Sequence, residues 1–277
     1  MTDRLQQAIR KARVEREGGQ GAGAPRSPVL SGQTVALPEL QEAWQGLEPL
    51  NITPKTVLRN RLVAYSGGEH AIPYDMLRTK ILQQCKKNDW RRIAVVSPSS
   101  GCGKTTTAAN LGFSFGRMSE SRTIVLDFDM RRRGLAQVLG QQVKHGMGAV
   151  LKRQIGFGEV GLCHDGNVAF GLNNTAERRP SEILQSQQAS DVLAEIEETY
   201  QPDIVLFDTP PLMSSDDSHG FLRSVDCALL LAVAEQTPMD QIDVCERQLS
   251  ELTNVMGIVL NRCRYTSGAH GYENDYY

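Results

Sequence analysis

Short, uniformly apolar runs alternate with longer amphipathic segments from about residue 72 onward. Each run has the length and the branched apolar residues of a buried strand. The segments between the runs carry apolar residues at helical spacing. The runs cover residues 92–97, 122–129, 203–211, 227–234 and 257–262, and the helical segments lie near 74–87, 105–117, 189–200, 217–224 and 237–252.

This alternation predicts an α/β fold. Strands that are apolar along their whole length are buried on both faces, which is typical of a mostly parallel sheet with helices on both faces. We therefore expect one doubly wound domain over residues 71–264. Ligands of such folds bind beyond the carboxyl ends of the strands, so the polar residues that follow the apolar runs are the candidates for function.

The segments outside this domain have a different character. Residues 1–17 show apolar residues at i, i+3, i+4 and i+7, which predicts a short amphipathic helix. That helix is either a solvated terminus or a docking helix for a protein partner or an anionic lipid surface. Residues 18–70, which begin rich in glycine, alanine and proline, are expected to form a flexible linker and an irregular segment. Residues 265–277 are expected to be a disordered tail that contains tyrosines.

Composition and charge exclude several classes of protein. A net charge of −2 over 277 residues does not fit a nucleic-acid-binding domain, which is usually strongly basic. The six cysteines include no CxxC pair, which argues against structural zinc and a disulfide framework. No apolar run approaches the ~20 residues of a membrane span, and the first residues lack the apolar core of a secretory signal. We expect a cytoplasmic protein that contacts a membrane only through a partner.

Residues 97–112, SPSSGCGKTTTAANLG, place a glycine-rich turn between a predicted strand and a predicted helix. Glycines let the backbone approach a ligand, and the amides at the start of a helix form a cradle for an anion. The turn matches the pattern G-x-x-x-x-G-K-[ST] except that Pro98 occupies the first glycine position. It predicts a nucleotide phosphate site formed by Ser100, Gly101, Cys102, Gly103, Lys104, Thr105 and Thr106.

Three carboxylates follow other apolar runs. Asp127 and Asp129 end one strand two residues apart, so their side chains point to the same side. Asp208 ends another strand, immediately before a threonine and two prolines. Any one of them alone could be a helix cap or a turn former. Together, beside a phosphate loop, they predict a Mg²⁺ site and a proton acceptor.

These residues resemble a known family. SPSSGCGKTTTAANLG resembles the Walker A loop of the deviant-Walker, MinD/ParA-like P-loop ATPases, LDFDMRR the Walker A′ motif of bacterial tyrosine kinases, and IVLFDTPP their Walker B motif. The resemblance spans about residues 72–264. It implies a P-loop NTPase fold, ATP and Mg²⁺ as cofactors, and phosphorylation of a tyrosine tail between neighbouring subunits of a homo-oligomer. It also implies activation by a transmembrane polysaccharide co-polymerase that regulates chain length, and a role in exopolysaccharide or capsule synthesis and export.

The resemblance also implies a role for each matching residue. Lys104 contacts the β- and γ-phosphates, and Asp129 is the base that takes the tyrosine proton. Thr105, Asp127 and Asp208 serve the metal. The remaining residues are Asn261 and Arg262, which match the place of base contacts, and the acceptor tyrosines Tyr272, Tyr276 and Tyr277.

One segment departs from the family pattern. The helix that joins neighbouring subunits in the family carries an acid and two arginines at three-residue spacing. This chain retains Arg78, Thr79 and Ile81 but has Ile72 and Asp75 in place of the acid and the first arginine.

Two other functions remain open beside the tyrosine autokinase: a regulatory ATPase switch, and an ATP-sensing adaptor of an export complex. Partitioning-type ATPases carry a second lysine early in the loop, which residues 97–100 lack. Cys102 inside the loop is either a small residue tolerated there or a redox switch, since a helix N-terminus favours a thiolate.

Overall fold

The computed structural model describes residues 37–263 except 215, 216 and 218. The predicted N-terminal helix at 1–17 and the tyrosine tail at 265–277 lie outside the described residues. No helix in the described part of the chain is long and apolar enough to cross a bilayer.

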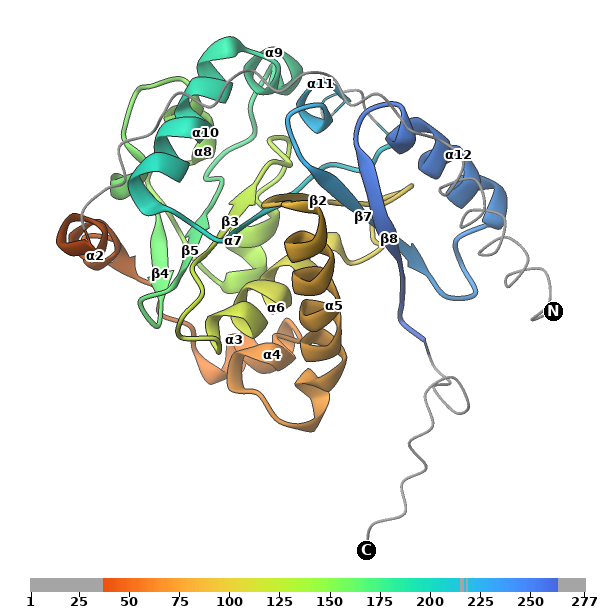
Figure 1. Ribbon diagram of the computed structural model, residues 1–277, viewed down its shortest axis with the longest axis horizontal. Coiled ribbons are helices and arrows are strands. Elements are labelled where there is room, and N and C mark those ends of the chain that lie inside the picture. The colour runs from red at the N-terminus through yellow and green to blue at the C-terminus, as the bar shows by residue number, and fades with distance from the viewer. Residues whose placement is uncertain (1–36, 215–216, 218, 264–277) are drawn as a thin grey trace, which may run out of the picture. The chain divides into compact units, whose positions relative to one another are not determined.

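A single sheet of eight strands forms the centre of the described domain, in the order β1-β4-β5-β3-β6-β2-β7-β8 (Figure 1). Neighbouring strands are parallel except for β4 and β5, which are antiparallel. The predicted α/β fold with a mostly parallel sheet is therefore confirmed. The strands are β1 (Glu48–Pro49), β2 (Arg92–Val96), β3 (Thr123–Asp127), β4 (Leu162–His164), β5 (Val168–Gly171), β6 (Ile204–Asp208), β7 (Cys227–Val233) and β8 (Asn254–Asn261).

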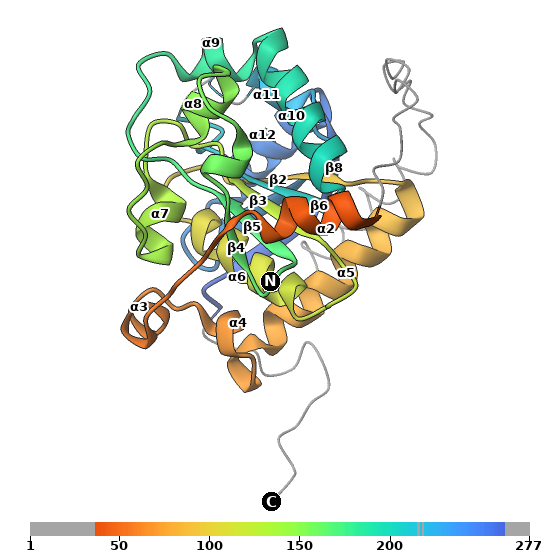
Figure 2. The ribbon, with the colours of Figure 1, turned by 90° about the vertical axis from the view of Figure 1, so that its left-hand side faces the viewer.

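Helices cover both faces of this sheet (Figures 1 and 2). One face carries α3 (Pro54–Arg59), α4 (Val63–Ser66), α5 (Ile72–Asn88), α6 (Lys104–Gly116) and α7 (Gly134–Leu139). The other carries α2 (Leu37–Gln45), α8 (Met147–Leu151), α9 (Pro180–Leu184), α10 (Gln187–Tyr200), α11 (His219–Leu222) and α12 (Met239–Ser250). Two 3₁₀ turns, η1 (Glu69–Ala71) and η2 (Phe157–Glu159), complete the described elements.

The central strands are apolar throughout because successive side chains enter two different cores. In β2, Ala94 and Val96 belong to the core on the α10 face, whereas Ile93 and Val95 belong to the core on the α6 face. All four are completely buried. Strands with alternate residues on opposite faces, both of them covered, are therefore apolar except at their ends.

The expectation of an irregular segment over residues 18–70 is wrong for its described part. Residues 37–71 form α2, β1, α3, α4 and η1, so they belong to the folded domain. In α2, Leu40 and Trp44 enter the core, and the Trp44 Nε1–H donates to the Tyr200 carbonyl at 2.8 Å. These helices are four to nine residues long, too short for their apolar spacing to repeat visibly in the sequence.

Strands β1, β4 and β5 also escaped prediction. They are two, three and four residues long, so none gives a sustained apolar run. Strands β4 and β5 pair as an antiparallel hairpin, and its turn includes Asp165 and Gly166, both with positive φ. This hairpin extends the sheet beyond β3.

We expect Trp44→Ala to lower the free energy of unfolding by about 3–5 kcal/mol, because it leaves a cavity under α2 and removes a buried hydrogen bond. Leu37→Ala in the same helix, where Leu37 is 73% exposed, should change it by less than about 0.5 kcal/mol. Urea unfolding of both variants measures the difference. Equal effects would mean that α2 does not belong to the folded domain.

Candidate functional site

The predicted phosphate loop lies between the carboxyl end of β2 and the start of α6. Gly101 and Gly103 have φ values of 80° and 93°, in the left-handed region that a residue with a Cβ rarely adopts. Gly103 is the residue before the first turn of α6, which begins at Lys104. The loop therefore presents backbone amides at a helix N-terminus, the arrangement that favours a bound anion.

Lys104 is buried within this loop. Its side chain reaches back so that Nζ donates to Ser97 Oγ at 2.9 Å, and the residue is only 7% exposed. Burial lowers the pKa of its ammonium group, while the negative charge of Asp208 acts in the opposite direction. The structure thus places a desolvated cation beside the amides that would meet a phosphate.

Asp127 and Asp208 lie side by side at the carboxyl ends of β3 and β6, where they are direct partners in the strand register. Both residues are completely buried. Asp127 Oδ1 and both carboxylate oxygens of Asp208 have no hydrogen-bond partner among the described residues, and only Asp127 Oδ2 accepts a bond, from the Leu135 amide at 3.1 Å. Burial raises the pKa of Asp208 to about 7, and burial followed by the charge of Asp208 raises the pKa of Asp127 well above its usual range.

Buried carboxylates without partners fit a divalent cation. Mg²⁺ binds proteins through one or two carboxylates and completes its shell with water and substrate phosphates. Thr105 offers a hydroxyl beside them. A Cβ added to Gly134 would lie 3.2 Å from Thr105 Oγ1 and 3.6 Å from Asp208 Oδ2, so both oxygens border the same point. No set of three or more His, Cys, Asp or Glu in the described residues forms a metal cage. These residues therefore fit a Mg²⁺ site in which the phosphate oxygens of a bound ligand supply further ligands to the metal.

Asp129 lines a cleft of about 430 Å³ next to the loop. The residue is 9% exposed, and burial raises the pKa of its carboxyl while the positive charges of Arg132 and Lys104 oppose that effect. Arg131 does not project into solvent alone, because its guanidinium forms a bidentate pair with the buried Asp217 at 2.5 and 2.9 Å. The cleft is lined by Ser100, Asp129, Arg131, Arg132, Pro210, Pro211 and Ser214.

Asn173 is a site residue that sequence reasoning missed. Its Nδ2 donates to the carbonyls of Asp127 at 3.1 Å and Asp129 at 3.3 Å, so it fixes the backbone that carries both acids. Asn173 follows β5, a strand too short to be predicted, and only the fold brings it to this end of the sheet.

Cys102 is buried in the loop and 2% exposed. Burial acts to raise the pKa of its thiol, but hydrogen bonds with Ser99 and Ser97 and the charge of Lys104 outweigh burial and lower it. The redox switch stays a prediction.

Arg78 and Asp75 of α5 are engaged within the chain. Arg78 Nη1 donates to the carbonyl of Ser114 at 2.5 Å and to its Oγ at 3.2 Å, and it pairs with Asp75 at 3.4 Å. Asp75 also pairs with Arg117 and accepts a hydrogen bond from Ser114 Oγ. Arg78, the arginine that this chain retains from the subunit-contact pattern, therefore holds α5 against α6.

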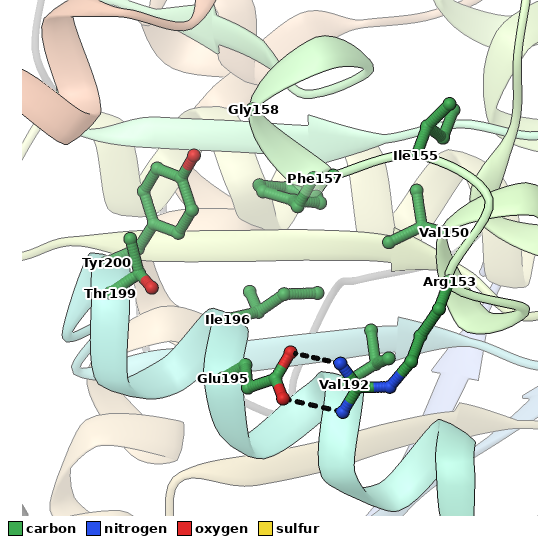
Figure 3. A pocket seen from close by; sticks show the side chains of 11 residues that line it. Val150, Arg153, Ile155, Phe157, Gly158, Val192, Glu195, Ile196, Thr199 and Tyr200 are labelled. Carbon is green, nitrogen blue, oxygen red and sulfur yellow. Dashed lines mark hydrogen bonds and ion pairs between the residues drawn. The ribbon is translucent and has the colours of Figure 1, made fainter.

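A second pocket of about 360 Å³ lies between α10 and the α8–η2 segment (Figure 3). Its lining is mainly apolar and includes Phe157, Ile196 and Tyr200, and its charged residues, Arg153 and Glu195, form a bidentate pair at 2.6 and 3.0 Å. None of the predicted site residues lines it, and its charges neutralise each other.

Comparison with known proteins agrees with this geometry. Residues 93–275 match the sequence profile described as the CobQ/CobB/MinD/ParA nucleotide binding domain. The chain belongs to this nucleotide-binding family. Its relatives include bacterial tyrosine kinases. It is 25% identical over 202 residues to the tyrosine-protein kinase CpsD of Streptococcus pneumoniae, and the match covers 72% of this chain and 86% of CpsD.

Another relative is much longer than this chain, and a solved structure shares its fold at low sequence identity. It is 26% identical over 184 residues to AmsA of Erwinia amylovora, and the match covers 65% of this chain but only 25% of AmsA. Among solved structures, the chimerical protein CapA2B2 superposes with a TM-score of 0.66 at 18% identity, covering 80% of this chain and 97% of CapA2B2. At that identity the likeness shows a shared fold.

The structure brings most of the predicted site residues of this nucleotide-binding domain to one end of the sheet. Lys104, Thr105, Asp127, Asp129 and Asp208 lie around the loop, and the side chains of Asn261 and Arg262 bond to its backbone. Tyr272, Tyr276 and Tyr277 lie outside the described residues.

We expect Asp208→Asn to stabilise the protein at pH 8 in a buffer without Mg²⁺ and nucleotide. Asp208 has a pKa of about 7 in the folded state, above the ~3.9 of an unfolded chain, so the folded state binds more protons between these values. Wild-type stability therefore falls as the pH rises through this range, and Asp208→Asn removes that loss. The gain at pH 8 should be roughly 1–4 kcal/mol, at about 1.4 kcal/mol per pKa unit.

Chemical unfolding between pH 5 and 8 tests this dependence. Asp203→Asn, just before the other end of β6, is the control and should leave the wild-type slope in place. A lower stability of Asp208→Asn at pH 8 would contradict the strained carboxylate pair.

Proposed function

We propose that this protein is an ATP-dependent protein-tyrosine autokinase that phosphorylates tyrosines of its own C-terminal tail. The observation that carries the proposal is the adjacent, buried carboxylate pair Asp127–Asp208 beside the phosphate loop, in which three of the four oxygens have no hydrogen-bond partner among the described residues. Similarity to the tyrosine-protein kinase CpsD supports the choice of tyrosine as acceptor.

Each residue has a chemical task in this proposal. The loop amides and Lys104 bind the β- and γ-phosphates of ATP, and Thr105, Asp127 and Asp208 hold Mg²⁺. Bound there, Mg²⁺ would neutralise charge on the transferring phosphoryl group. Asp129 accepts the proton of the tyrosine hydroxyl, and its raised pKa makes the carboxylate a better base near neutral pH.

The acceptors in this proposal are Tyr272, Tyr276 and Tyr277, supplied by another copy in a homo-oligomer. The activator is a transmembrane polysaccharide co-polymerase at the inner face of the plasma membrane, and the process regulated is exopolysaccharide or capsule synthesis. The family resemblance and the match to CpsD support this role.

A regulatory ATPase is the second candidate, and one observation favours it. Arg78 is bonded to Ser114 and Asp75 of its own chain, so α5 lacks a free arginine for the subunit contact that phosphorylation between copies uses. A nucleotide switch needs no such contact.

Incubation of the purified chain with ATP and Mg²⁺, followed by mapping of phosphotyrosine by mass spectrometry, tests the proposal. We expect Lys104→Met to lower phosphotyrosine by about 100-fold or more, because a buried cation at the transferring phosphate is lost. Asp129→Asn should lower it by about 10²–10⁴-fold, the usual contribution of a general base. Lys80→Met, which changes an exposed lysine of α5, should have no effect.

Cutting the chain after Arg264 removes the acceptors and should abolish phosphotyrosine while ATP hydrolysis persists. Phosphotyrosine that is unchanged in Lys104→Met would refute the kinase. ATP turnover without phosphotyrosine in the wild type would support the regulatory ATPase instead.

A further inference from the structure

We propose that Asn261 and Arg262 form a clamp that orients the peptide planes of the phosphate loop, so that the amides of Cys102 and Gly103 face the phosphates. The clamp rests on the proposed nucleotide site but not on tyrosine phosphorylation. Both residues are positioning residues in this proposal, because they act on the ligand through the loop backbone.

Two consecutive carbonyls of the loop accept hydrogen bonds from the end of β8. Asn261 Nδ2 donates to the carbonyl of Cys102 at 2.8 Å, and Arg262 Nη2 donates to the carbonyl of Gly101 at 2.8 Å. These bonds join parts of the chain that are 159 and 161 residues apart. They are therefore long-range tertiary contacts rather than features of the loop itself.

Peptide geometry converts these two bonds into an orientation of two amides. Each carbonyl lies in one plane with the N–H of the next residue and points the opposite way. Holding the Gly101 carbonyl therefore directs the Cys102 amide away from β8, and holding the Cys102 carbonyl does the same for the Gly103 amide.

These two amides have no hydrogen-bond acceptor among the described residues. Cys102 is only 2% exposed and Gly103 is partly buried, so water does not readily replace the missing partner of the Cys102 amide. A shielded amide without a partner is costly in a folded protein. The cost is removed when an anion accepts both hydrogen bonds, as a phosphate does in a nest of amides.

The clamp requires an amide side chain at position 261. Asn261 Oδ1 accepts from the Arg262 backbone N–H at 2.8 Å while its Nδ2 donates to the loop, so both ends of the amide are used. Arg262 has φ 57°, an uncommon value for a residue with a Cβ, and the bond to Asn261 Oδ1 holds that conformation.

Gly103 is the matching feature on the loop side. A Cβ at Gly103 would lie 2.4 Å from Asn261 Nδ2, so only glycine allows Asn261 to come this close. The glycine thus serves the approach of the clamp as well as the left-handed backbone.

A clamp and a contact to the nucleotide base predict different results with a ligand that has no base. We would measure binding of ADP and of inorganic triphosphate, each with Mg²⁺, by isothermal titration calorimetry on the full chain. The variants are Asn261→Leu, which removes the donor without adding charge, Asn261→Asp and Arg262→Met. Asn254→Leu is the matched control, because Asn254 Nδ2 makes an equivalent bond to the Asp226 carbonyl at the other end of β8.

We expect Asn261→Leu to weaken the binding of ADP and of inorganic triphosphate by the same factor, about tenfold or more. The Gly103 amide loses its orientation, and Arg262, which orients the Cys102 amide, loses the bond to Asn261 Oδ1. Asn254→Leu should leave both affinities within about twofold of wild type, and melting temperatures without ligand should be similar for the two variants. Arg262→Met should lower the affinity for both ligands. Asn261→Asp should lower both affinities at least as much as Asn261→Leu does.

Several outcomes would overturn the clamp. Weakening of ADP alone would mean a base contact, and weakening by Asn261→Asp but not by Asn261→Leu would mean a charge effect. If the wild-type protein binds neither ligand, the nucleotide site and the clamp are both refuted. Wild-type binding without phosphotyrosine refutes the kinase alone and leaves the clamp to be judged by its variants.

Discussion

The described domain depends on the placement of two carboxylates, Asp127 and Asp208, in direct register at the buried ends of neighbouring parallel strands. Two carboxylates this close and this buried, with three of their four oxygens unbonded, cannot both carry a charge without a cost in stability. A fold tolerates such a pair when a ligand relieves it, and here the carboxylates lie next to Lys104 and the amides of the phosphate loop. The site is a region where the protein gives up stability for binding.

Side-chain hydrogen bonds hold the backbone around this pair. Asn173 fixes the backbone of Asp127 and Asp129, and Asn261 fixes the loop that faces them. Both asparagines donate to backbone carbonyls. Asn173 follows β5 and Asn261 ends β8, two strands that are distant in the sequence. Supporting side chains that bond to the backbone of a site are what hold its charged residues in place.

Much of the central sheet could be predicted because strands such as β2 are buried on both faces and leave an unbroken apolar run in the sequence. The loop and the three acids could be found because each follows such a run. What could not be predicted has a common cause: α2, β1, β4 and β5 are too short for a periodic pattern. Other features arise from contacts between distant segments, which periodicity does not encode. They are the hydrogen bonds of Asn173, the ion pair Arg131–Asp217 and the hydrogen bond of Arg78 to Ser114.

Strand β1 has a consequence for solubility during and after folding. A parallel sheet with an open border exposes a row of amides and carbonyls that can pair with another chain, which leads to aggregation. Here one border is a strand of only two residues, Glu48 and Pro49, and the proline has no N–H to offer. This edge of the sheet therefore offers few backbone groups to which a strand of another chain could pair.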